Sequence, residues 1–150
     1  MMLLTVVVSL SAMAQSADKL YEEGKKLYDE KKYEAAFPKL KTAAEKGHKK
    51  AQYRLGRCYD KGHGTAEDNQ LALQWYEKAA KQGHAKSEFQ MGKAYYKGKS
   101  IKGDKALAKK WLLRAVRNEK GGDGVLEDLR KDAADGNEDA KGMLALIGKK

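Results

Sequence analysis

Three histidines and one cysteine are the side chains of this chain whose chemistry could support catalysis or metal binding: His48, His63, His84 and Cys58. His48 and His84 each follow a glycine and stand 36 residues apart, which indicates that they mark a repeated turn. A histidine site would require them to converge, and one repeat translation separates them. No carboxylate recurs at a sequence spacing shared with a histidine or a serine nucleophile, and the glycines at 62 and 64 lack the following Lys-Ser/Thr of a phosphate loop. We therefore expect no catalytic residue, no metal ion and no cofactor.

The single cysteine limits the fold as well as the chemistry. One cysteine forms neither an internal disulfide nor a four-cysteine zinc module. Cys58 shares a predicted helical side with Leu55 and Tyr59, and Ala94 stands at the equivalent position 36 residues later. We expect Cys58 to be a small buried side chain rather than a nucleophile, and the fold to depend on packing alone.

The composition is that of a basic globular protein. The 150 residues carry a net charge of +10, with 41% hydrophobic and 35% charged residues. This hydrophobic content is enough for a core and excludes wholesale disorder, and the length favours one domain. The excess of lysine and arginine favours an acidic partner, which leaves nucleic acid, anionic lipid, acidic polysaccharide and acidic protein open.

The N-terminal residues narrow that choice of partner. Residues 1–10 form an apolar run that is shorter than the about 20 residues needed to span a bilayer. Small residues follow at Ala12 and Ala14, a pattern typical of a signal peptide, so we expect residues 1–14 to be removed and the protein to be periplasmic or secreted. The alternative is a buried N-terminal helix of a cytosolic protein. Export would make nucleic acid a poor partner.

An internal repeat carries most of the structural information. An offset of 36 residues aligns many positions of 51–86 with 87–122, including Gly56 with Gly92 and Trp75 with Trp111. A weaker copy covers about 19–50, and an incomplete one occupies the C-terminal segment 123–150.

Each copy is predicted to be a pair of helices. Apolar residues recur at helical spacing in 51–59 and again in 71–80, and Lys61-Gly62-His63-Gly64 separates the two runs. Residues 65–68 offer side chains that cap the second helix. Gly56 and Gly92 lie inside the first helix of their copies, where glycine is unfavourable, so we expect them to allow close packing against alanines of the second helix.

The motif A-x-x-x-L-G-x-x-Y-x-x-G-x-G followed by D-x-x-x-A-x-x-W-x-x-K-A-A-x-x-G resembles the Sel1-like repeat family, a relative of tetratricopeptide repeats. The resemblance implies an all-α, right-handed α-solenoid of antiparallel helix pairs, here one domain over 15–150. The first helices of the pairs would line a concave groove. Family members usually act as adaptors or scaffolds that bind other proteins, and bacterial members are often exported. The segment 123–150 would cap the array, with the apolar positions Ala140, Met143, Leu144 and Ile147 on one helical face.

The groove prediction depends on positions counted from the glycine of each first helix. Residues three before, one after and four after that glycine share one helical stripe. The stripe contains cations flanked by aromatic rings, namely Tyr21, Lys25, Tyr28, Tyr53, Arg57, Phe89, Lys93 and Tyr96. Such a lining suits a protein or peptide with acidic side chains or a C-terminal carboxylate. The alternative is that the rings belong in part to the core and the cations are merely solvated.

Two other functions remain as alternatives. Lysines concentrate in 86–120, and this basic face would suit an acidic glycan or anionic lipid of the envelope, unless it serves only for solubility. Some cysteine-rich Sel1-like proteins are described as β-lactamase-like, which makes such an enzyme a weaker alternative. Those proteins have a cysteine pair in each repeat, whereas Cys58 is alone here, so we expect no enzymatic activity.

Overall fold

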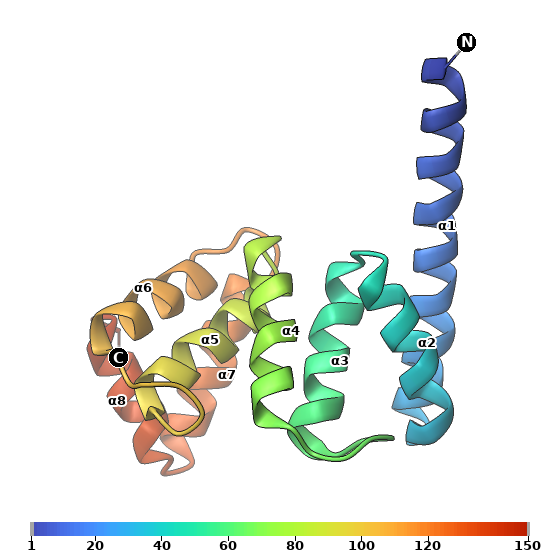
Figure 1. Ribbon diagram of the computed structural model, residues 1–150. Coiled ribbons are helices and arrows are strands. Elements are labelled where there is room, and N and C mark those ends of the chain that lie inside the picture. The colour runs from blue at the N-terminus through green and yellow to red at the C-terminus, as the bar shows by residue number, and fades with distance from the viewer. Residues whose placement is uncertain (1, 150) are drawn as a thin grey trace. The chain divides into compact units, whose positions relative to one another are not determined.

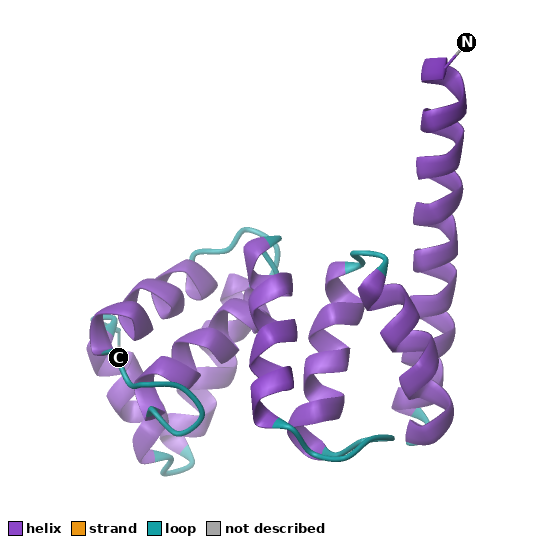
Figure 2. Ribbon diagram, in the orientation of Figure 1, coloured by secondary structure: helices purple, strands orange, loops and turns teal. Residues whose placement is uncertain are grey.

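The computed structural model describes residues 2–149, with side chains from Ser16 onward. These residues form helices joined by turns and loops, and none of them belongs to a strand (Figure 2). In order the helices are α1 (Met2–Asp29), α2 (Tyr33–Glu45), α3 (Lys49–Lys61), α4 (Asn69–Lys81), α5 (Ala85–Lys97), α6 (Lys105–Val116), α7 (Gly122–Ala134) and α8 (Glu138–Leu146). The predicted all-α class is confirmed.

The predicted signal peptide falls in the first half of α1. The side chains of 1–15 lie outside the described residues, and the α1 backbone runs on through Ala14 to Asp29. Ala17 is the first described side chain of α1 that is buried. Over the described residues, no helix combines the length and the apolar character that a bilayer crossing requires.

The chain divides into two compact units, Met1–Trp75 and Tyr76–Lys150, with the boundary inside α4. In the first unit α2 packs against both α1 and α3 (Figure 1). In the second unit α6 packs against α5, and α7 against α8. The first core includes Leu40, Leu55 and Cys58, and the second includes Leu112 and Leu129.

Helical glycines bring the paired helices close together. A Cβ atom added to Gly24 of α1 would lie 2.9 Å from Leu40 Cγ of α2, and one added to Gly92 of α5 would lie 2.7 Å from Leu112 Cγ of α6. Carbon atoms normally approach to about 3.5–4.0 Å, so only glycine fits here. Close packing at Gly92 is therefore confirmed. The prediction of alanine as the partner was wrong, because the atoms nearest to the glycine belong to a leucine that projects onto the helix backbone.

Glycines and aspartates set the helix ends within each repeat. Gly62 and Gly98 end α3 and α5 in the left-handed conformation, with φ of 64° and 65°. Asp68 and Asp104 then begin α4 and α6, since each carboxylate accepts a hydrogen bond from the backbone N–H three residues ahead at 2.9 Å. These ends agree with the predicted break between the two helices.

The repeated histidines begin the first helices. Nδ1 of His48 accepts a hydrogen bond from the N–H of Ala51 at 3.1 Å, and His84 caps α5 in the same way at 3.3 Å. Asn137 does so for α8 at 3.0 Å. Burial is the main reason that the pKa of His48 is lowered, which keeps its ring neutral and Nδ1 able to accept. Capping thus explains why the histidine recurs with the repeat.

The C-terminal helix closes the second core as predicted. Ala140, Met143, Leu144 and Ile147 are all buried in it. Acidic residues stand in the first turn of α8, where the helix dipole favours them.

Candidate functional site

An aromatic cluster in the first unit joins α1, α2 and the loop after α3. The Tyr28 hydroxyl and Nδ1 of His63 share a hydrogen bond at 2.8 Å, and the His63 ring stacks on Tyr33 with centroids 3.9 Å apart and planes 7° apart. Burial raises the pKa of Tyr28, while burial and the nearby Arg57 lower the pKa of His63. Both shifts favour the neutral form of each side chain, so the hydrogen bond joins a protonated tyrosine to a neutral histidine. The Tyr28 ring of this cluster also contacts two cations of α3.

Two arginines of α3 lie over the Tyr28 ring, Arg54 at 5.2 Å and Arg57 at 5.6 Å from its centroid. Arg54 binds Asp29 at 3.1 Å, and Lys25 approaches the other oxygen of the same carboxylate at 3.4 Å. Arg57 differs from both, because no carboxylate among the described residues forms an ion pair with it. It is a partly exposed guanidinium held over a ring with its hydrogen-bonding edge available.

The predicted groove residues of the first unit divide into two groups. Tyr21 and Tyr28 are each only 6% exposed, and Tyr21 stacks on His48 at 4.3 Å. Tyr53 and Arg57 of α3 and Lys25 of α1 remain partly exposed. The two buried rings therefore act as core side chains, as the alternative interpretation held for the rings, whereas the cations and Tyr53 face the surface.

The predicted residues of the second unit all lie on α5. Phe89 and Tyr96 pack against the core, and Tyr96 reaches the backbone of Gly142 in α8. Lys105 Nζ lies 3.2 Å from the centre of the Tyr96 ring. Lys93 is partly exposed, and within the described part of the chain it makes no ion pair. Lys93 is thus the member of this group with an available charge.

A buried polar network in the second unit was missed at the sequence level. The Glu88 carboxylate, 1% exposed, receives Arg114 Nε at 2.6 Å and Asn118 Nδ2 at 3.0 Å. The same two side chains donate to the carbonyls of Ala80 at 3.2 Å and Gly83 at 3.0 Å. The network attaches α6 to the turn before α5. The available signal was the recurrence of a polar residue, Gln52 and then Glu88, beside a small buried residue.

The reactive residue types have no enclosed site among the described residues. Cys58 is buried with 0% exposure, which confirms it as a core side chain, and burial raises the pKa of its thiol to about 12, which disfavours the nucleophilic thiolate. Ser16 and Lys19 of α1 have the Ser-x-x-Lys spacing of serine β-lactamases, but both are exposed on the helix surface. No group of three histidine, cysteine, aspartate or glutamate side chains in the described range is arranged to hold a metal ion.

The helix pairs described above match a known repeat. The Sel1 repeat family matches residues 49–84, which form α3 and α4, and 85–120, which contain α5 and α6. The chain contains two Sel1 repeats.

Solved structures agree with this assignment. A Sel1 repeat protein from Oxalobacter formigenes is 32% identical with a TM-score of 0.65, and the match covers 85% of this chain and 54% of that one. A protective antigen present in uropathogenic Escherichia coli strains, which displays an SLR fold, is 28% identical with a TM-score of 0.67 over 93% of this chain and 32% of its own. This chain thus spans about half and about a third of those two proteins. No curated protein matches it significantly.

Sel1 repeats are commonly protein-interaction scaffolds. In this chain α1 and α2 precede the two matched repeats, and α7 and α8 follow them.

Proposed function

We propose that this Sel1 repeat protein is a non-enzymatic adaptor that binds an acidic segment of another protein on the α1–α3 surface of its first unit. The observation that carries the proposal is Arg57. Its guanidinium is partly buried over Tyr28, and it lacks a carboxylate partner within the described residues. A neighbouring arginine in a similar position, Arg54, already binds Asp29.

The chemistry of this surface favours a carboxylate ligand. An arginine binds a carboxylate through two parallel hydrogen bonds, and partial removal from water strengthens such a pair. Tyr53 on the same helix offers contact area to a peptide backbone, and Lys25 adds positive charge from α1. An aspartate or glutamate side chain, or the C-terminal carboxylate of a peptide, satisfies these requirements. Lys93 of α5 provides a second unpaired cation, which is tested separately.

We propose export on the basis of the N-terminal pattern. Cleavage after Ala14 would leave Ala17 and the rest of the packed face of α1 in the mature protein. N-terminal sequencing of the protein from a periplasmic extract tests this, with Gln15 expected as the first residue. A first residue upstream of Gln15, or recovery only from the cytosol, would contradict export.

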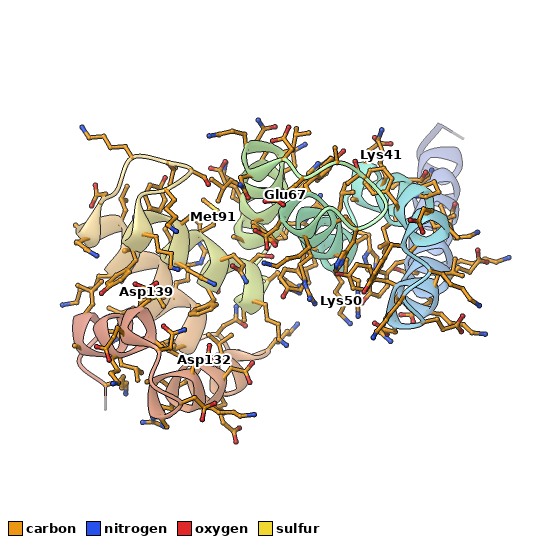
Figure 3. The ribbon with its side chains drawn as sticks, turned by 90° about the horizontal axis from the view of Figure 1, so that it is seen from below. Lys41, Lys50, Glu67, Met91, Asp132 and Asp139 are labelled. Atoms are coloured by element: carbon orange, nitrogen blue, oxygen red, sulfur yellow. The ribbon has the colours of Figure 1, made fainter. Side chains whose placement is uncertain are left out.

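The binding proposal is tested by recovering partners from the native envelope fraction. Wild type is compared with Arg57→Glu and, separately, Lys93→Glu. Lys41→Glu, on the exposed side of α2, is the control with the same change in charge (Figure 3). We expect Arg57→Glu to lose the partner that wild type and the control retain, and Arg57→Lys to weaken binding because a lysine lacks the paired donors.

Two results would contradict the adaptor assignment. Equal recovery by wild type and Arg57→Glu would show that this surface does not bind the partner. Hydrolysis of a chromogenic cephalosporin by the purified protein would instead support the β-lactamase-like alternative.

A further inference from the structure

The second unit carries an open groove between α7 and α8, and none of the predicted groove residues lines it. The two helices lie side by side (Figures 1 and 3), and the groove has a volume of about 500 Å³. Its lining surface is largely apolar and includes three basic residues. It is lined by Arg130, Ala133, Ala134, Lys141, Leu144, Ala145 and Lys149.

The turn before α8 repeats the turn before α5. The N–H of Gly136 donates to the carbonyl of Ala133 at 3.1 Å, just as the N–H of Gly83 donates to Ala80 at 2.9 Å. In both turns the glycine has a positive φ and the next residue caps the following helix. Ala133 is therefore the structural equivalent of Ala80.

Counting from these caps makes Ala145 of α8 the equivalent of Gly92 of α5. In α5 this position is covered by Leu112 of α6, which is fully buried against Gly92. Arg114 of α6 also donates a hydrogen bond to the carbonyl of Ala80. The place next to α5 is thus filled by a helix.

The corresponding place next to α8 is open. Ala145 is exposed and Ala133 is only partly buried, and no helix among the described residues covers them. The groove therefore has the geometry of a helix-binding seat. One repeat earlier, the equivalent turn and the equivalent helix, α5, hold α6.

The seat next to α8 carries a positive charge where the filled seat next to α5 carries a negative one. Glu88 of α5 is the position that binds Arg114 of α6 at 2.6 Å. The equivalent position in α8 is Lys141, whose only ion pair in the described range is an exposed one with Glu138, three residues away, at 2.7 Å. Exposed pairs of this kind contribute little and exchange readily. A helix that enters the seat must therefore carry an acidic residue where α6 carries Arg114.

We propose that the α7–α8 groove binds an acidic amphipathic helix of a partner protein. The residue of that helix that packs on Ala145 is small and apolar. At the equivalent position of α5, Gly92 leaves room for Leu112, whereas the methyl group of Ala145 occupies that room. An aspartate or glutamate two positions later faces Lys141, and Arg130 and Lys149 attract further acidic residues. A second copy of α6 is a poor occupant, since it would bring Arg114 against Lys141.

This seat lies in the second unit and is independent of Arg57. Its test uses two stapled helical peptides based on residues 103–118, in which Lys105, Lys109, Lys110 and Arg117 are changed to Glu so that both peptides are acidic. Both also carry Leu112→Ala, and the first carries Arg114→Glu in addition, whereas the second keeps Arg114. Binding of each to the full chain is measured by fluorescence anisotropy at low ionic strength.

We expect the glutamate peptide to bind wild type about fivefold more tightly than the arginine peptide, since an attractive pair replaces a repulsive one. Lys141→Glu should reverse that preference, and Ala145→Trp should abolish binding of both peptides by filling the groove. Both protein positions are exposed, so the folded state should tolerate these changes, which circular dichroism checks. Absence of binding, equal affinity of the two peptides, or binding that survives Ala145→Trp would each overturn the proposal. A preference for the arginine peptide would favour a second copy as the occupant.

Discussion

Gly92→Ala tests whether the glycine of α5 sets the distance between α5 and α6. The new methyl carbon would lie 2.7 Å from Leu112 Cγ and 3.1 Å from the Leu112 backbone nitrogen. A rotation of the leucine side chain relieves the first contact but not the second, so α6 must move away from α5. Overpacking of this kind costs about 1–3 kcal/mol, and the gain in helix propensity offsets up to about 1 kcal/mol. We expect a net loss of about 1–2 kcal/mol.

The assay is urea unfolding followed by circular dichroism at 222 nm. Gly124→Ala in α7 is the matched control, because a Cβ there meets nothing within 4 Å. It should raise the unfolding free energy by up to about 1 kcal/mol through propensity alone. Leu112→Ala provides a second background, in which the penalty of Gly92→Ala should shrink because its main steric partner is gone. An increase in stability for Gly92→Ala equal to that of the control would refute the steric explanation.

Three further predictions concern polar groups and a turn. Arg114→Ala should lower the unfolding free energy by roughly 2 kcal/mol, because it leaves the buried Glu88 carboxylate without its cation. Adding Glu88→Gln should restore part of the loss, and urea titration measures both changes. In the folded protein the pKa values of His48 and His63 are lowered from their unfolded values. The contribution of these two residues to the unfolding free energy should therefore be fully present above the unfolded pKa of about 6.5, and should be lost as the pH drops through the lowered folded pKa. His48→Asn keeps the cap and should flatten this dependence, and an unchanged slope would contradict the assignment. Gly64→Ala should lower the melting temperature, because φ is +72° and the new methyl would collide with the backbone at the start of α2.

The helices could be predicted because the repeat places glycine and aspartate at their ends. Gly62 and Asp68 carry this information in their own backbone preferences, which depend little on the rest of the fold. Close packing at Gly92 was predicted correctly, but the residue that packs against it was not. Spacing along one helix indicates which face is buried, whereas the residue opposite depends on where two helices cross.

The candidate site was predictable only in part. Counting from Gly24 placed Tyr21 and Tyr28 correctly on one helical face, yet that face turns toward His48 and His63 and is buried. A sequence pattern does not reveal whether an aromatic stripe is covered by a histidine that lies distant in the chain. The availability of Arg57 depends in the same way on Asp29 pairing with its neighbour Arg54 instead.

Cys58 gives the first unit an internal probe of its own opening. The sequence has one cysteine, and its fully buried thiol becomes accessible only when the packing around α3 separates. The rate of thiol labelling in the native protein therefore measures the opening equilibrium of that unit, without any engineered reporter. Comparison with the unfolding free energy of the whole chain would show whether the two halves of this array open together or one at a time.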